Sequence, residues 1–83
     1  MKEQIIIYYD KDRHSKNDYI VKRVLTQEKE YYKIVSYYME YDKLREYHSN
    51  LLLTDENVNR YVLECMKAPY FNHIEYQSIM EVI

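Results

Sequence analysis

The side chains of this sequence that could do chemistry are few, and the first group of them is acidic. Asp10, Asp12, His14 and Asp18 have the spacing with which a calcium-binding loop begins. Such a loop needs glycine at its sixth position and glutamate at its twelfth, where this sequence has serine and valine. We therefore interpret the stretch as a solvated turn.

The histidines and the single cysteine do not form a recognisable site either. The three histidines, at 14, 48 and 73, include no pair four residues apart. Cys65 is the single cysteine and so cannot form a Cys-x-x-Cys motif, and no zinc site is expected. Cys65 lies among apolar residues at helical spacing, which is typical of a small buried side chain. We interpret Asp42 and Glu46 as part of a solvent-exposed face. The serines are not flanked by the glycines that a nucleophile elbow requires. We expect no catalytic residues, no cofactor, no metal and no small-molecule substrate, so the chain is not expected to be an enzyme.

Composition narrows the classes further. The sequence has no glycine, and phosphate-cradling loops and dinucleotide fingerprints require it. Tyr, Ile, Lys and Asn are abundant, as in proteins of AT-rich genomes, which favours a phage or another mobile element as the source. One cysteine, no signal-like segment and no long apolar run predict a cytoplasmic protein that does not bind a membrane.

The elements that would position these side chains form, in our prediction, a single α+β domain over residues 1–83. The runs at 4–9 and 18–26 are β-branched and aromatic, which predicts an N-terminal β-hairpin joined by a polar loop. A long helix is predicted over 27–49, because Thr26 resembles an N-cap and apolar residues fill one arc at 100° per residue, although 31–41 also alternates like a strand.

One or two shorter helices complete the prediction. Thr54 is an N-cap candidate, and Pro69 would end the helix that follows it. The apolar positions of that helix recur at i, i+3, i+4, i+7 and i+8, at Val58, Tyr61, Val62, Cys65 and Met66. The tail fits a short helix after Asn72, which we favour, and a strand almost equally well.

Tyrosine is the most unusual feature, since six of the twelve fall within residues 30–47. On a helix, five residues would share an outer stripe, beyond the main apolar arc: Tyr32, Ser36, Met39, Lys43 and Tyr47. Tyr and Met are enriched in the centres of protein interfaces. This predicts a protein-binding module, such as an inhibitor or adaptor, that docks a tyrosine-rich helical face onto a larger protein or onto a second copy of itself. The competing interpretation is that the stripe belongs to the core.

An alternative function is the binding of RNA or single-stranded DNA by the basic hairpin. Its phosphate contacts would be Lys11, Arg13, Lys16, Lys22 and Arg23, with Tyr8, Tyr9 or Tyr19 for base stacking. Residues 1–33 hold eight Lys/Arg against six Asp/Glu, a net charge of +2, whereas residues 34–83 hold four against eight, a net of −4. Because phosphate neutralisation supplies most of the affinity for nucleic acids, the acidic second part disfavours this alternative.

Overall fold

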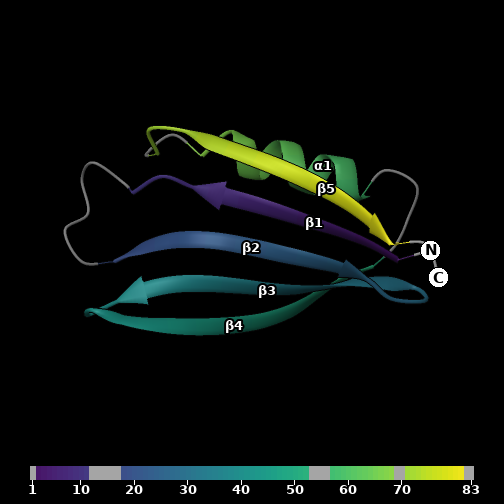
Figure 1. Cartoon of the computed structure of the whole chain (residues 1–83), viewed down its shortest axis with the longest axis horizontal. Coiled ribbons are helices and arrows are strands. Elements are labelled where there is room, and N and C mark those ends of the chain that lie inside the picture. The colour runs from purple at the N-terminus through teal and green to yellow at the C-terminus, as the bar shows by residue number, and fades with distance from the viewer. Residues whose placement is uncertain (1, 12–17, 53–56, 69–70, 82–83) are drawn as a thin grey trace.

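Five antiparallel strands and one helix make up the described part of the chain (Figure 1). The computed structural model describes residues 2–11, 18–52, 57–68 and 71–81. The elements in chain order are β1 (Lys2–Tyr9), β2 (Tyr19–Gln27), β3 (Tyr31–Glu40), β4 (Lys43–Leu52), α1 (Asn57–Met66) and β5 (Ile74–Glu81).

The strands are ordered β4-β3-β2-β1-β5, so β4 and β5 form the two edges of the sheet. The chain passes from the β4 edge to the β5 edge through α1, which therefore lies across one face of the sheet, behind β5 in Figure 1. We call the face that carries α1 the inner face. No element of the described residues covers the opposite, outer face.

The predicted α+β architecture of a hairpin packed on a long helix is wrong, because the described residues form a mostly-β domain of five antiparallel strands and one short helix. The segment 27–49, predicted as the long helix, contains β3 and β4. Tyr32, Ile34 and Ser36 are buried on the inner face, and they alternate with Tyr31 and Lys33, which are exposed. Apolar residues also occupy the outer face, between these inner-face residues. The sequence of β3 therefore fits the helical period of about 3.6 as well as the strand period of two. Pairing with β2 on one side decides between the two periods, since a helix here would leave the hydrogen-bonding edge of β2 unpaired.

The turn between β3 and β4 explains why the sequence concealed the hairpin. Glu40 pairs with Lys43, which leaves a two-residue loop of Tyr41 and Asp42, with φ of 49° and 63°. Positive φ at both central residues is the requirement of a type I′ turn, which Asn-Gly usually meets. Since this chain has no glycine, its tightest turn carries no ordinary turn signal.

The C-terminal prediction is also wrong, whereas the other two local predictions are confirmed. The segment expected to form a short helix after Asn72 is β5, which pairs antiparallel with β1 along its whole length. The strands predicted at 4–9 and 18–26 pair antiparallel as β1 and β2. The helix predicted between Thr54 and Pro69 is α1, although these two residues lie outside the described part of the chain.

An irregularity in β2 determines which of its side chains face inward. The register with β3 shifts between Ile20 and Lys22, so Val21 is an extra residue in the strand. Ile20 is consequently buried on the inner face, and Lys22 lies on the outer one. Arg23 and Leu25 also face inward, so the bulge puts Ile20 on the same face as Leu25, which an unbroken alternation along the strand would not do.

The core fills the space between the inner face and α1. Ile7 and Leu25 are fully buried, and each contributes about 1.5 to 3 kcal/mol relative to an exposed side chain. Val62 and Cys65 of α1 pack on the same cluster and are 8% and 7% exposed, which confirms that the cysteine is a buried side chain. The remaining members of the core cluster are Ile5, Tyr9, Ile20, Tyr32 and Ile34.

Candidate functional site

Arg23 is the only arginine that the structure places half-buried on the inner face, between the sheet and α1. Its Nη1 donates a hydrogen bond to the hydroxyl of Tyr61 at 3.1 Å and lies 3.2 Å from Sγ of Cys65, both on α1. Its Nη2 donates to the hydroxyl of Tyr38 on β3 at 3.0 Å. The guanidinium carbon is also 5.9 Å from the ring centre of Tyr9, close enough for a cation–π interaction. Four elements therefore converge on one cation.

The charge of Arg23 is not balanced by any carboxylate among the residues that the structure describes. Within the described ranges no carboxylate forms an ion pair with it, and its Nε is buried without a hydrogen-bond acceptor. Burial by itself would lower the pKa of Arg23, but the hydrogen bond to Tyr38 and the nearby phenols raise it on balance, so the group stays charged. Burial also raises the pKa of Tyr9 and of Tyr61, which keeps both phenols neutral. A buried charge is normally paired, so this arrangement is incomplete electrostatically.

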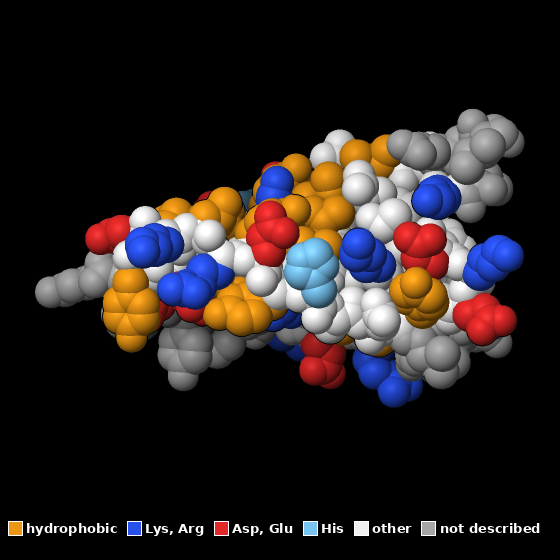
Figure 2. Space-filling view, turned by 90° about the horizontal axis from the view of Figure 1, so that it is seen from below, with side chains coloured by type: hydrophobic (Ala, Val, Ile, Leu, Met, Phe, Trp, Pro, Cys, Tyr) orange, Lys and Arg blue, Asp and Glu red, His pale blue; other side chains and the backbone are white. Residues whose placement is uncertain are grey.

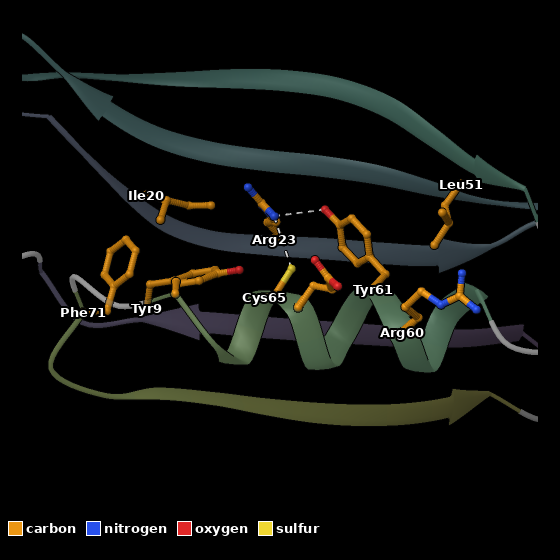
Figure 3. Close-up of a pocket in the computed structure, with 10 residues that line it drawn as sticks. Tyr9, Ile20, Arg23, Leu51, Arg60, Tyr61, Cys65 and Phe71 are labelled. Carbon is orange, nitrogen blue, oxygen red and sulfur yellow. Dashed lines mark hydrogen bonds between the residues drawn. The ribbon is translucent and has the colours of Figure 1, made fainter.

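A cavity of about 520 Å³ opens beside this cation, between α1 and β2 (Figure 3). Figure 3 shows Arg23, Tyr61 and Cys65 meeting at its centre, while Tyr9 and Phe71 stand together at one end, with ring centres 5.0 Å apart. Leu51 lies at the other end, and Arg60 and Glu64 on α1 bring opposite charges to the wall. The volume falls in the range of about 300 to 1,000 Å³ typical of ligand sites.

A second hollow of about 410 Å³ continues from the first over β3 and β4, and both hollows share Arg23 and Tyr61. Tyr47 stands in it, edge-on to the ring of Tyr38 with 5.4 Å between ring centres. We call the two hollows together the Arg23 groove. It is an aromatic-walled channel with one cation on its floor.

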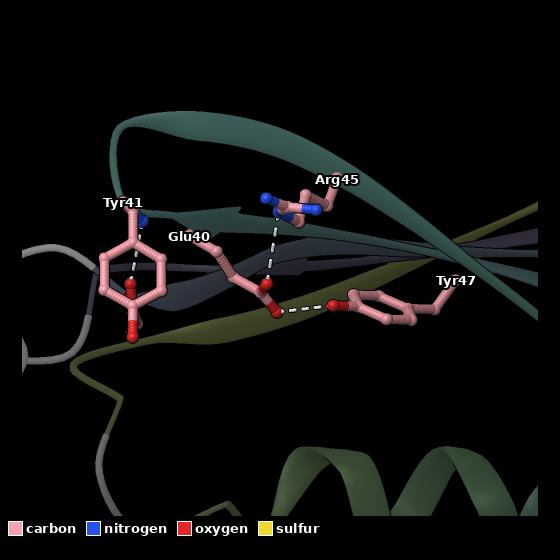
Figure 4. A network of polar contacts seen from close by, with 5 residues as sticks. Glu40, Tyr41, Arg45 and Tyr47 are labelled. Carbon is pink, nitrogen blue, oxygen red and sulfur yellow. Dashed lines mark hydrogen bonds and ion pairs between the residues drawn. The ribbon is translucent and has the colours of Figure 1, made fainter.

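The far end of the Arg23 groove has its own, fully paired carboxylate (Figure 4). The hydroxyl of Tyr47 donates to Oε1 of Glu40 at 2.8 Å, and Nε of Arg45 lies 3.4 Å from Oε2 of the same carboxylate. The hydrogen bond to Glu40 raises the pKa of Tyr47. Glu40 lines the same hollow as Arg23, but its ion pair is with Arg45 and not with Arg23.

The five residues predicted to form a helical stripe do not share one surface, since the helix itself is absent. Tyr32 is 2% exposed and Ser36 is buried, so two of them belong to the interior, as the competing interpretation held. Met39 lies on the outer face of β3, and Lys43 begins β4. Tyr47, 47% exposed, is the one that lines the Arg23 groove and stays accessible. Whether these side chains bind a partner remains a prediction.

The basic residues of the nucleic-acid alternative are also divided. Arg13 and Lys16 lie outside the described residues, and Arg23 faces inward. Lys11 is exposed with its Nζ 5.4 Å from the ring centre of Tyr19, whereas Lys22 lies on the outer face, 5.0 Å from the ring centre of Tyr37. The three that the structure describes, Lys11, Lys22 and Arg23, do not form one basic patch.

On the outer face Lys22 stands between two tyrosines in a row that crosses the sheet. Tyr8 of β1 pairs with Lys22, and Lys22 pairs with Tyr37 of β3. The row ends in a glutamate at each side, Glu75 on β5 and Glu46 on β4. Seen from the β4 side, the surface likewise mixes cationic, anionic and hydrophobic side chains rather than gathering one sign of charge (Figure 2).

The described residues contain no cluster of metal ligands: no group of three or more of their His, Cys, Asp or Glu side chains could hold a metal ion. Within the same ranges no helix is long and apolar enough to span a membrane.

Sequence reasoning missed the grouping around Arg23, because it placed Tyr61 on the apolar side of its helix and Arg23 among the phosphate contacts of the hairpin. The signal that could have found Arg23 is the period of two, which puts it on the same face of its strand as Leu25.

Comparison with known proteins gave no relative: no family model, no curated protein and no solved structure matches this chain.

Proposed function

We propose that this chain is a protein-binding module, and that the Arg23 groove receives a carboxylate-bearing segment of a partner protein. The observation that carries the proposal is the guanidinium of Arg23, which is half-buried, charged and without a carboxylate partner on the floor of an open groove. A carboxylate arriving from outside would supply the missing counter-charge through charge-assisted hydrogen bonds.

The composition of the groove supports a polypeptide as its occupant. Tyr and Arg are the residues most enriched where protein partners make their strongest contacts, and this groove offers Tyr9, Tyr38, Tyr47 and Tyr61 around Arg23. Its two hollows meet at Arg23 and Tyr61, one beside α1 and the other over β3 and β4, so consecutive side chains of one segment could occupy them. Binding of this kind needs no catalysis and no cofactor, as the sequence predicted, and an inhibitor or adaptor role in the cytoplasm remains part of the proposal.

The test is a peptide-display selection against the immobilised chain, followed by calorimetric titration of the selected peptides. We expect enrichment of peptides with Asp, Glu or a free C-terminal carboxylate next to an apolar residue. Arg23→Gln should weaken these peptides roughly 10- to 100-fold, because hydrogen bonds to charged groups contribute about 1.5 to 3 kcal/mol. Lys22→Gln is the matched control: it removes the same charge from the neighbouring residue on the opposite face, and should change affinity less than twofold.

A thermodynamic cycle makes the assignment specific. Changing the peptide's carboxylate to an amide should weaken binding to the unmodified chain but have little further effect on the Arg23→Gln variant, because both changes remove one interaction. Equal losses in the two backgrounds, or selected peptides that bind without any carboxylate, would refute the proposal. The circular dichroism spectrum of each variant verifies that it is folded.

The outer-face row of Tyr8, Lys22 and Tyr37 keeps nucleic-acid binding as a second candidate, because an aromatic–cation–aromatic row can stack bases and contact a phosphate. The glutamates at both ends of the row make it the weaker candidate. Titration of a labelled oligoribonucleotide at low and at moderate salt separates the two candidates. If the oligoribonucleotide does not bind at low salt, nucleic-acid binding is eliminated.

A further inference from the structure

A second groove runs along the other side of α1, and a carboxylate lies in its wall. α1 separates the Arg23 groove from β5, as Figure 3 shows, and the second cavity, of about 990 Å³, lies between α1 and the strands β1 and β5. Val58, Val62 and Met66 of α1 form one apolar wall, and Tyr76 stands on β5 opposite them. We call this cavity the Glu3 groove.

Two short hydrogen bonds hold the carboxylate of Glu3 in place. The hydroxyl of Tyr32 donates to Oε2 at 2.6 Å, and the hydroxyl of Ser78 donates to Oε1 at 2.6 Å. Both donors lower the pKa of Glu3, so the carboxylate is ionised at neutral pH. No lysine, arginine or histidine in the described part of the chain forms an ion pair with it.

We infer that the Glu3 groove receives a lysine or arginine side chain of the partner protein. Such a side chain has an apolar stem and a cationic head, and the groove offers apolar walls together with a fixed anion. The inference rests on the proposed function, since it assumes a protein partner, but it concerns a different groove and the opposite charge. A segment that crosses α1 would present an acidic side chain to Arg23 and a basic one to Glu3.

The first experiment probes the groove with a small cation. The ¹⁵N-labelled full chain is titrated with n-butylammonium chloride and, separately, with n-butanol, and backbone amide shifts are followed by NMR. We expect saturable shifts at Val62, Met66 and Ser78 with n-butylammonium, and at least tenfold weaker binding of n-butanol, which has the stem but not the charge. Absence of these shifts, or equal binding of the two compounds, would overturn the inference.

Two variants assign the charge. Glu3→Gln keeps the shape of the side chain and one of its two acceptor oxygens but removes the negative charge, and should weaken n-butylammonium at least tenfold. Glu75→Gln removes the same charge from the exposed outer row and should leave binding unchanged. An equal loss in both variants would point to general charge attraction and would overturn the assignment; the comparison of n-butylammonium with n-butanol does not depend on either variant.

The selected peptides then distinguish this inference from the proposed function. If the inference holds, replacing the peptide's basic residue by norleucine weakens binding to the unmodified chain and has little effect on Glu3→Gln. The Arg23 groove is tested separately, by replacing the peptide's acidic residue and by Arg23→Gln. The proposal for one groove can therefore be refuted while the proposal for the other holds. If replacing the basic residue weakens binding equally to the unmodified chain and to Glu3→Gln, that residue does not bind beside Glu3.

Discussion

Replacing Tyr41 and Asp42 by Asn and Gly should stabilise the protein. Both residues adopt positive φ in the two-residue turn between β3 and β4, and the left-handed conformation costs an ordinary residue about 1 to 2 kcal/mol. Tyr41 is 76% exposed, so its ring contributes little packing that the change would remove. Its backbone N–H donates to Oδ1 of Asp18 at 3.0 Å, and a change of side chain preserves that donor (Figure 4).

The expected size of the effect follows from the two opposing terms. Relief of the left-handed conformation is worth about 1.5 to 2 kcal/mol in total, because Asp tolerates it better than Tyr, and the added glycine gives back about 0.5 to 1 kcal/mol through the greater entropy of the unfolded chain. The net gain is about 1 kcal/mol, which corresponds to a rise in Tm of about 4 to 8 °C for a domain of this size.

Urea unfolding followed by circular dichroism measures this change. The midpoint should rise while the slope m stays constant. The control is Glu30→Gly, at an exposed turn residue whose φ is not positive, where glycine should lower stability by a few tenths to about 1 kcal/mol. A double variant no more stable than the parent would show that the turn is not strained and that this reading of its backbone is wrong.

Two further predictions test the core and the Glu3 carboxylate. Leu25→Ala, at a fully buried position, should destabilise the fold by about 2 to 5 kcal/mol in urea unfolding, whereas Leu44→Ala, 58% exposed, should change stability by less than about 0.5 kcal/mol; similar losses at both would contradict the assignment of the two faces. The pKa of Glu3 is lowered below its usual 4.5 by the hydroxyls that donate to it, so its ionised form stabilises the fold above about pH 4.5 and that contribution is lost as the pH falls through the folded-state pKa. The stability difference between the unmodified chain and Glu3→Gln should therefore shrink from pH 7 to pH 3, and a difference that is the same at both pH values would argue against these hydrogen bonds.

Local pattern was sufficient for the elements whose apolar residues repeat with one clear period. The apolar positions of α1 fit the helical spacing without exception, and β1 and β2 are rich in β-branched and aromatic residues. It failed for β3 and β4, because Tyr31, Val35 and Tyr37 on the outer face fill in the gaps between the inner-face residues. With apolar side chains on both faces, the period of two is blurred and a broad helical arc appears in its place.

The sequence by itself determined the helix α1, the first two strands and the burial of Cys65. Only the tertiary structure decided that the first strand pairs with the last, because β5 is ambiguous alone and becomes a strand by completing the hydrogen bonds of β1. It also decided the two candidate sites. Arg23 meets Tyr38 and Tyr61 because β3 pairs with β2 and α1 lies across the same face of the sheet. Glu3 meets Tyr32 and Ser78 because three strands distant in sequence are neighbours or near neighbours in the sheet. A pairing register is set by contacts between segments, so no single segment of the sequence contains it.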